Sequence, residues 1–517
     1  MKRTITAAIF VLVAITCMSA MPTHAEDAAQ TCRNLYRMTD SAYAVEPGIW
    51  ITAKDAAPAH CRVRGVINRA IRFEITLPGS GWNTRMMFST VGGFAGNFGD
   101  TTSLLSRGFA MASSDTGHEG PESTFLRQPQ AVIDYAYRGN HLVTVFAKRV
   151  IGRFYGRDVQ HAYLQGCSNG GRAALMEALR FPDDYDGIIA GAPAFQLKES
   201  WLWHVAAHRA QVANPLTHEA LEVLAGASEA ACDTIDGVED GVIGDPRACT
   251  SKYFDLSSLM CSAGEATDCL SEGQIRTAKF LYGGLVDLNT GAVLAHGVMP
   301  GVENGGDWGS WGVGGTSDVA SPQGPVVPHE GRMITILGDL LYRDPSFDPN
   351  TFDPIRDRDK LNDAAAVMDV NSAELREFQD RGGKLLMYQG WNDYPLRPQR
   401  ALDYLSLAEA QNGGAENTSE FFRLFMVPGM QHCAGGPGPW QADYVDPIVD
   451  WVENGKAPER IIGKQPGIVT MKDLFAGIEP AKDAKVFTRP LCPHPQSAKY
   501  SGRGNVDDAS SWDCAAN

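Results

Sequence analysis

Three residues of this 517-residue chain, Ser168, Asp393 and His432, could together activate a hydroxyl group for attack on a carbonyl carbon. Ser168 is the centre of Gly-Cys-Ser-Asn-Gly, which follows a β-rich run at 161–165 and precedes a helix-like run at 172–180. A strand, Gly-x-Ser-x-Gly and a helix in this order form the pattern of a sharp turn that exposes a nucleophilic serine. An ordinary Gly-rich turn is the alternative, because the pentapeptide alone is common.

The other two residues follow predicted strands. Asp393 comes after the buried-type run 384–388, and His432 comes after the run 423–427. The chain order serine, aspartate, histidine is that of the α/β-hydrolases and differs from the orders of chymotrypsin and subtilisin. In such a triad the histidine is the base and the aspartate orients it. These residues therefore predict a site for acyl transfer.

The cysteines indicate whether Ser168 and His432 lie close together in the fold. Ten cysteines remain after Cys17, which lies in the N-terminal apolar segment, and in an oxidising compartment they should pair. Local spacing predicts four pairs and leaves Cys167 with Cys433. That bond would bring His432 beside Ser168, since bridged Cα atoms lie about 4.4–6.8 Å apart; two unrelated cysteines are the alternative. The chain has no Cys-x-x-Cys pair to indicate a zinc site. The full predicted set is Cys32–Cys61, Cys167–Cys433, Cys232–Cys249, Cys261–Cys269 and Cys492–Cys514.

Strands and helices alternate around the serine. The run 71–77 alternates apolar and polar residues, which predicts a half-buried strand, whereas 86–91 suits a more buried one. Another short strand is predicted at 109–114, and residues 141–155 have helical periodicity. This pattern predicts an α/β fold with a mostly parallel sheet, specifically an α/β-hydrolase core with an inserted lid domain. Ser168 would then lie at the carboxyl end of a strand, where such sheets bind ligands.

Two further segments follow strands near the predicted site. The glycine-rich segment 92–96 could present main-chain N–H groups to a cleft as one wall of an oxyanion hole, or it could be an ordinary loop. His118 could be catalytic, but a histidine in such a loop more often orders it by hydrogen bonding, and we favour that interpretation.

The chain divides into four predicted parts. Residues 1–25 have the charged start, short apolar run and small-residue cleavage site of a signal peptide. The α/β pattern occupies 26–200 and resumes at 356–517, and the segment between them, 201–355, lacks it. We expect 201–355 to be a lid over the site. Its aromatic residues Trp308 and Trp311 could stack on a planar substrate, or they could form the lid's own small core.

An acidic loop inside the predicted lid could bind a metal ion. Three aspartates, each near a glycine or a turn, bring hard oxygen atoms together, as Ca²⁺ requires, although the spacing is not that of an EF-hand. A solvated acidic loop closed by the Cys232–Cys249 bond is the alternative. The predicted ligands are the side chains of Asp233, Asp236 and Asp240 and the carbonyl groups of Val238 and Val242.

Overall composition limits the partners. The formal net charge is −16 and becomes −18 without the two cations of the signal peptide (43 − 61), so a nucleic-acid partner is not expected. No later stretch is long and apolar enough to span a membrane. We therefore expect a secreted or periplasmic protein that does not associate with a membrane after the signal is removed.

Several longer motifs together resemble the tannase and feruloyl esterase family of secreted serine esterases, which includes mono(2-hydroxyethyl) terephthalate hydrolases. They cover nearly all of the mature chain. The matching stretches are Ser-Asp-Thr-Gly-His at 114–118, Gly-Cys-Ser-Asn-Gly-Gly-Arg at 166–172, 180–194, the acidic loop at 232–249, 382–393, Gly-Met-Gln-His-Cys at 429–433 and Arg-Pro-Leu-Cys-Pro at 489–493.

This resemblance implies a triad joined by the disulfide, a calcium-binding lid loop and an oxyanion hole made by the main-chain N–H groups of Asn169 and Gly93, with Gly92 as the second choice. It also implies small-molecule esters of hydroxycinnamic, gallic or related aromatic acids as substrates. The region between about 200 and 355 departs most from the family, and lid residues select the substrate there. The alternatives are another α/β-hydrolase-type esterase such as a terephthalate monoester hydrolase, a secreted peptidase or lipase, a non-catalytic binding protein and a calcium-dependent structural protein.

Overall fold

A computed structural model of the chain describes residues 24–54, 56–262, 267–304, 306–313, 329–344, 346–468, 470 and 479–516. The predicted signal peptide therefore lies almost entirely outside the described residues. Helix α1 (His24–Arg33) is the first described element, and the Cys32–Cys61 disulfide fastens it to the sheet. No helix in the described part of the chain has the length and apolar character needed to cross a membrane.

A ten-stranded sheet forms the centre of the molecule, in the order β1-β3-β4-β6-β5-β7-β8-β11-β12, with β2 paired to β3. The strands up to β4 pair antiparallel, and those from β6 to β12 run parallel. This confirms the predicted α/β class with a mostly parallel sheet. The strands are β1 (Tyr43–Val45), β2 (Ile49–Ile51), β3 (His60–Ile67), β4 (Ile71–Pro78), β5 (Arg85–Ser89), β6 (Ala110–Ser114), β7 (His161–Cys167), β8 (Gly187–Gly191), β11 (Lys384–Gly390) and β12 (Phe422–Val427).

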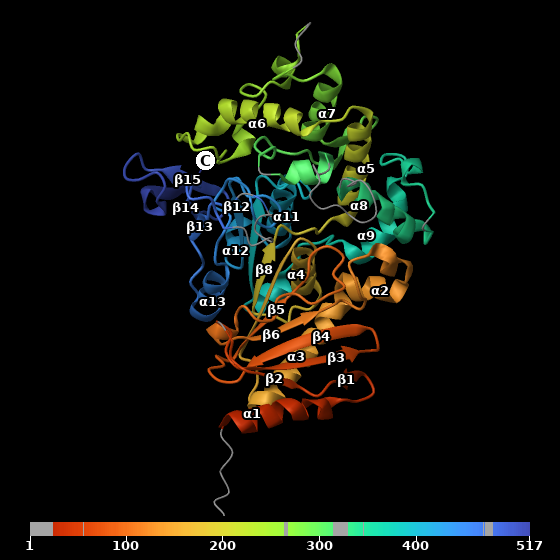
Figure 1. Ribbon diagram of the computed structural model, residues 1–517, viewed down its shortest axis with the longest axis vertical. Helices are drawn as coiled ribbons and strands as arrows, with labels where there is room; N and C mark the ends of the chain where they lie inside the picture. The colour runs from red at the N-terminus through yellow and green to blue at the C-terminus, as the bar shows by residue number, and fades with distance from the viewer. Residues whose placement is uncertain are drawn as a thin grey trace, which may run out of the picture.

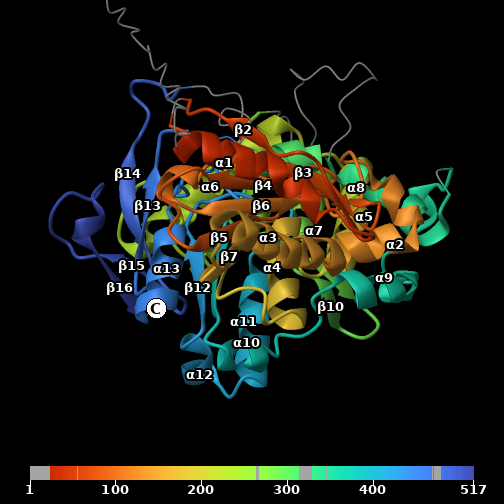
Figure 2. The same ribbon diagram turned by 90° about the horizontal axis from the view of Figure 1, so that it is seen from below.

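Helices cover both faces of this sheet (Figures 1 and 2). Successive residues of a strand point to opposite faces, so Met86 and Phe88 of β5 belong to one hydrophobic core and Met87 belongs to another. The first core is closed by α3 (Gly139–Tyr155), α4 (Asn169–Arg180) and α11 (Gln399–Gln411). The second is closed by α13 (Val445–Asn454).

Strand β4 is more buried than its alternating pattern predicts. The polar residues Glu74 and Thr76 are both buried. The hydroxyl group of Thr101 donates to Glu74, Arg64 forms an ion pair with Glu74, and the Thr76 hydroxyl donates to the Thr101 carbonyl. The expectation of a half-buried strand was therefore wrong, because a later loop covers the polar face and satisfies its hydrogen bonds.

The segment from β8 to β11 packs around a separate core that includes Trp201, Leu224, Leu281 and Trp308. In Figure 1 its helices α6 and α7 lie at the end of the molecule opposite α1. The regular elements of this segment are α5 (Leu197–Ala213), α6 (His218–Cys232), α7 (Glu272–Gly283), β9 (Leu285–Asp287), β10 (Ala292–Ala295), α8 (His329–Leu337), α9 (Asn362–Met368) and α10 (Arg376–Asp380).

The two tryptophans of the predicted lid have different environments. Trp308 is fully buried between the rings of Tyr282 and Tyr394. Trp311 is half-buried and stacks on His204. The structure therefore favours the core interpretation for Trp308, whereas Trp311 keeps an exposed part.

Short elements complete the fold. Two hairpin-like sheets near the C-terminus lie beside β12 in Figure 1, and the Cys492–Cys514 bond joins them. The small helices α2 and α12 lie at the edges of the core. Their bounds are α2 (Pro129–Ile133), α12 (Ala415–Ser419), β13 (Ile461–Gln465), β14 (Phe487–Leu491), β15 (Gln496–Tyr500) and β16 (Trp512–Ala516).

Candidate active site

Ser168 occupies a strained turn between β7 and α4. Its φ is 63° and its ψ is −125°, a conformation that costs free energy for any residue with a side chain. Glycines allow the neighbouring segments to approach this turn. A Cβ atom added at Gly166 would lie 1.7 Å from the Thr90 hydroxyl oxygen, and one at Gly171 would lie 2.4 Å from the Gly191 carbonyl oxygen. The motif therefore forms the nucleophile turn that its sequence indicates.

All five expected disulfides are present. In the Cys167–Cys433 bond the two Cα atoms are 6.0 Å apart, although 266 residues separate them in sequence. Ser168 and His432 are the immediate neighbours of these cysteines. The bond therefore holds the loop after β12 against the turn after β7.

Asp393 and His432 form a buried pair. Asp393 is 0% exposed and His432 is 16% exposed, and the Asp393 Oδ2 atom lies 2.9 Å from His432 Nδ1. The carboxylate of Asp393 also accepts hydrogen bonds from the Gln389 amide (2.9 Å) and the Leu396 main-chain N–H (2.8 Å). These bonds fix the carboxylate, which in turn orients the imidazole with Nε2 available for a hydroxyl group.

A carboxylate from the predicted lid, that of Asp307, also reaches this pair. Its Oδ2 atom accepts a hydrogen bond of 2.7 Å from the main-chain N–H of His432. The adjoining residues make similar contacts, because Asn392 donates to the Gly301 carbonyl and Gln431 donates to the Asn304 carbonyl. Gly301, Asn304 and Asp307 therefore contact both loops that carry the pair.

Electrostatics keep His432 basic. Burial alone lowers the pKa of His432, but the charge of Asp393, the hydrogen bond to it and the charge of Asp307 outweigh burial and raise that pKa above its ordinary value. Burial, followed by the charge of Asp393, raises the pKa of Asp307 to about 7. A base with a raised pKa accepts a hydroxyl proton more readily.

The glycine loop and the start of α4 adjoin Ser168 on two sides. A Cβ atom added at Gly92 would lie 3.7 Å from the Ser168 Cβ atom, so the glycine loop passes directly beside the serine. Gly93 has a φ of 57°, and its carbonyl accepts a hydrogen bond of 3.0 Å from the Tyr135 hydroxyl. Asn169 begins α4, and the first N–H groups of a helix have no acceptor within it. The arrangement suits the binding of an oxyanion, with Gly92 and Gly93 both near.

The acidic loop contains oxygen atoms that could act as metal ligands, but these atoms do not lie close together in the described part of the chain. Asp233 accepts from the N–H groups of Gly241 and Val242, and Asp240 accepts from Arg489 at 2.8 Å. In the described part of the chain, the carboxylates of Asp233, Asp236 and Asp240 do not come within 4.8 Å of one another as a group of three.

The electrostatics of this loop nevertheless suit a cation. Burial raises the pKa of Asp236 to about 6, and the charges of Asp240 and Asp233 add to the effect. Asp236, Asp240 and Val242 line a cavity of about 210 Å³. Carboxylate oxygens that repel one another are suitable ligands for a hard divalent cation, so the residues fit Ca²⁺ chemically.

Sequence reasoning missed three residues that hold the site. Asp307 and Gln389 contact the Asp393–His432 pair as described above. Arg172 is fully buried, and its guanidinium donates to the Asn169 side chain and to the main-chain carbonyls of Ala136 and Tyr135. The only signal in the sequence was the position of this arginine directly after the Gly-Gly of the serine motif, because its burial is not visible there. Asp307 lies within an aromatic and glycine-rich patch that gave none.

His118 is not part of this arrangement. Its ring stacks on Phe125 at a centroid distance of 3.8 Å, and burial lowers its pKa. This packing agrees with a role in ordering its loop, but through ring stacking rather than through the expected hydrogen bonds, since neither buried ring nitrogen has a hydrogen-bond partner among the described residues.

Comparison with known proteins agrees with this geometry. Residues 57–515 match the family model described as tannase and feruloyl esterase. The chain is 34% identical to an uncharacterized esterase of Xanthomonas campestris over 90% of this chain and 85% of that protein. It is 30% identical to the mono(2-hydroxyethyl) terephthalate hydrolase of Piscinibacter sakaiensis over 92% and 89% of the two chains.

Solved structures show the same fold. Feruloyl esterase B from Aspergillus oryzae superposes with a TM-score of 0.80 at 24% identity and covers 94% of this chain and 100% of that chain. Tannin acyl hydrolase from Aspergillus niger superposes with a TM-score of 0.72 at 22% identity, covering 92% and 91%. These matches confirm the predicted α/β-hydrolase fold. The chain belongs to the tannase and feruloyl esterase family and is a carboxylic ester hydrolase of that type.

Proposed function

We propose that this enzyme hydrolyses esters of aromatic carboxylic acids through an acyl-enzyme formed on Ser168. The observation that carries the proposal is the covalent bond between Cys167 and Cys433, which holds the Asp393–His432 pair against the strained serine turn.

In the proposed first step, His432 Nε2 takes the proton of the Ser168 hydroxyl while Oγ attacks the ester carbonyl carbon. The N–H groups of Asn169 and Gly93, or Gly92, stabilise the negative charge on the carbonyl oxygen, and each such donor typically contributes about 2.7–4 kcal/mol. Asp393 stabilises the imidazolium that forms. The imidazolium then protonates the leaving alcohol as the C–O bond breaks. In the second step, His432 takes a proton from water as the water oxygen attacks the acyl carbon. The bond from that carbon to Ser168 Oγ then breaks, the imidazolium returns the proton to Oγ, and the acid is released.

The aromatic acyl group is proposed from the relatives. The names of three of them refer to feruloyl, terephthalate and tannin acyl substrates, which share an aryl group conjugated with the ester carbonyl, either directly or through a vinyl group. Hydroxycinnamic and gallic esters are the first choice here, and a terephthalate monoester is the second.

A substrate panel tests this proposal. Purified enzyme would be offered methyl ferulate, methyl gallate, mono(2-hydroxyethyl) terephthalate, p-nitrophenyl palmitate and a peptide. We expect an aryl ester to have the highest kcat/KM, and we expect the Ser168→Ala variant to have none of that activity at an unchanged Tm. Faster cleavage of the palmitate ester or the peptide would refute the aromatic preference. A fully active Ser168→Ala variant would refute the mechanism, and failure of the wild type to react with a fluorophosphonate probe would favour a binding protein.

We also propose that Ca²⁺ binds the acidic loop through the side chains of Asp233, Asp236 and Asp240, with the carbonyl groups of Val238 and Val242. When bound, the ion would neutralise the mutual repulsion of these carboxylates and stiffen the loop. The raised pKa of Asp236, about 6, predicts weaker binding below that pH. Excess EGTA should lower the Tm of the wild type but not that of Asp236→Asn. An unchanged wild-type Tm would argue against the site.

Export is the remaining part of the proposal. The five disulfides are consistent with an oxidising compartment. If residues 1–25 are removed as a signal peptide, the mature protein begins at Glu26. N-terminal sequencing of protein from the culture medium or periplasm would check this. A mature chain that retains Met1 would contradict this.

A further inference from the structure

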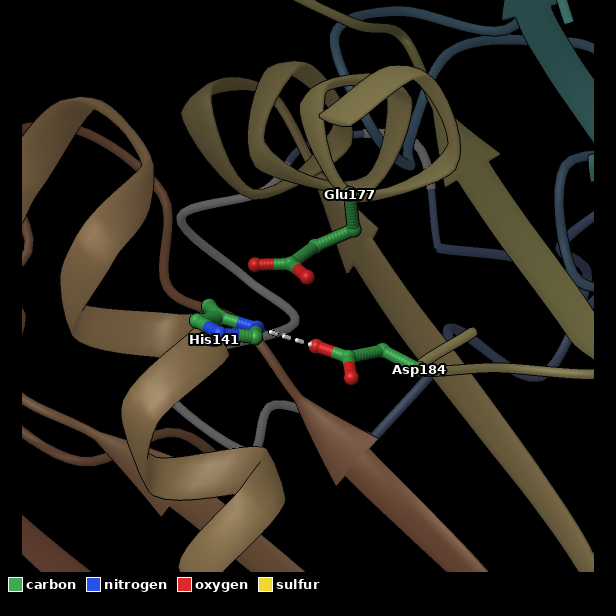
Figure 3. A group of neighbouring side chains, drawn as sticks. All are labelled: His141, Glu177 and Asp184. Carbon is green, nitrogen blue, oxygen red and sulfur yellow. Dashed lines mark hydrogen bonds and ion pairs between the residues drawn. The ribbon is translucent and has the colours of Figure 1, made fainter. Parts of the chain in front are cut away.

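Three side chains that ester hydrolysis does not use meet at the end of α4 farthest from Ser168. His141 comes from α3, Glu177 comes from the last turns of α4, and Asp184 comes from the loop before β8 (Figure 3). His141 Nδ1 lies 2.7 Å from Asp184 Oδ2, and one potential ligand atom of each residue lies within 4.8 Å of the other two. Within the described ranges, no other group of His, Cys, Asp or Glu converges in this way.

Glu177 makes this group unusual. It is only 1% exposed, and neither of its carboxylate oxygens has a hydrogen-bond partner. Figure 3 shows its carboxylate directed into the space between His141 and Asp184. Burial, with a further contribution from the charge of Asp184, raises the pKa of Glu177 well above its usual value. A buried carboxylate without a partner is costly, so a proton or a cation is expected beside it.

We propose that His141, Glu177 and Asp184 bind a divalent first-row transition-metal ion such as Zn²⁺. One imidazole nitrogen with two carboxylates is a donor set that suits Zn²⁺, whereas Ca²⁺ takes oxygen ligands. The ion would take the place of the hydrogen bond between His141 and Asp184. His141 is 27% exposed, which gives an ion a path to the buried Glu177.

The surroundings leave the three ligand groups free to bind. The ring of His141 stacks on Phe181 at 3.8 Å with an interplanar angle of 9°, which holds it in one orientation. Lys148 is the nearby cation, but its ammonium group donates to the main-chain carbonyls of Asp183 and Asp184 rather than to a carboxylate of the group.

A metal ion here would act on structure rather than on the ester. It would join α3, α4 and the loop that leads into β8. Helix α4 begins at Asn169, the proposed oxyanion donor, so the ion would fix the far end of the helix on which the reaction depends.

Zinc binding by full-length mature enzyme without a polyhistidine tag tests the proposal. Chelator-treated protein would first be saturated with Ca²⁺, so that the proposed calcium site in the acidic loop stays filled. It would then be dialysed against Zn²⁺. We expect about one zinc ion per chain by elemental analysis and a higher Tm with Zn²⁺. Glu177→Gln keeps the shape of the side chain and His141→Gln changes a partly exposed residue, and each should weaken zinc binding at least about tenfold. Glu272→Gln, which changes an exposed acid paired with Arg276, is the matched control and should retain zinc.

Two outcomes would overturn the site. The first is an absence of stoichiometric zinc in the wild type, in which case Glu177 simply shares a proton with Asp184. The second is equal zinc uptake by the wild type, Glu177→Gln and His141→Gln, which would place the ion elsewhere. If Glu177→Gln does not fold, the His141→Gln result decides alone. None of these measurements reads esterase activity, so failure of the zinc site leaves the proposed ester mechanism standing.

Discussion

Two aspartate–histidine pairs lie at opposite ends of helix α4, and their geometry is almost the same. The Asp393–His432 pair has an O···N distance of 2.9 Å, and the Asp184–His141 pair has one of 2.7 Å. The third member differs. The first pair adjoins the Ser168 turn, because the Cys167–Cys433 bond joins the His432 loop to that turn, whereas the second pair converges with a buried carboxylate, Glu177. The comparison teaches that each pair supplies an oriented imidazole, and that in the two proposals the third group decides whether this imidazole would serve as a base or as a metal ligand.

The two histidines also differ in how they are held. His141 lies within α3, where the helix itself fixes its main chain. His432 lies on a loop after β12 and depends on the Cys167–Cys433 bond and on the hydrogen bond from its N–H to Asp307. A catalytic residue on a loop needs these supports, because loops otherwise have more conformational freedom.

The largest expected effect is that of Asp393→Asn, which removes the charge from the catalytic pair. The variant should lose about 10⁴-fold in kcat, because an amide favours the wrong imidazole tautomer and cannot stabilise the imidazolium. Initial rates with the best ester of the panel would measure this. The control is Asp403→Asn, which changes the more exposed His296–Asp403 pair and should stay within about threefold of the wild type. Retention of a tenth of the activity by Asp393→Asn would contradict a triad.

The second effect concerns the loop that carries His432. In the double variant Cys167→Ser with Cys433→Ser, the free energy of unfolding should fall by about 3–5 kcal/mol, because the bond closes a very long loop. The kcat/KM value should fall as well, since His432 is no longer held beside Ser168. Urea unfolding and ester hydrolysis would measure the two effects.

The matched control for this variant removes the Cys32–Cys61 bond, which joins α1 to β3 on the side of the sheet away from β11 and β12. Its loss should reduce stability and leave kcat/KM unchanged. If both double variants retained full activity, the disulfide would serve stability alone.

These contrasts also explain what could be predicted from the sequence. Ser168 and the parallel strands were predictable, because a turn motif and hydrophobic periodicity are local properties. The Asp393–His432 pair was predictable because cysteines mark distant contacts. Asp307 was not, since it meets His432 across 125 residues and its own neighbourhood is an aromatic patch. The burial of Glu177 beside His141 could not be predicted from the sequence either, because an acidic residue in a helix usually faces solvent.

The third effect distinguishes Glu177 from an ordinary surface acid. In metal-free protein its pKa is raised, so between its unfolded value near 4.5 and its higher folded value the native state binds more protons. The stability of the wild type should therefore fall as the pH rises through this window. Glu177→Gln should remove that fall and gain about 1–3 kcal/mol at pH 8. Chemical denaturation at pH 5 and pH 8 would measure it, and Glu272→Gln on the exposed Arg276 pair is the control. The same pH dependence in both variants would show that Glu177 is not the source.

The smallest effect separates the roles of the second carboxylate at each histidine. Glu177 converges on the ring of His141, whereas Asp307 bonds to the main chain of His432 and acts on the ring through its charge. That charge helps to raise the pKa of His432, and only the neutral imidazole can accept the serine proton. The acidic limb of the kcat/KM profile should therefore lie above pH 6.5, the ordinary histidine value, and Asp307→Asn should move it to lower pH by less than about one unit. The asparagine still accepts the hydrogen bond from the His432 N–H, so activity at pH 8 should change little. An unshifted limb with a lower kcat at every pH would mean that Asp307 positions the loop without tuning the base, and His432 would then owe its basicity to Asp393 alone.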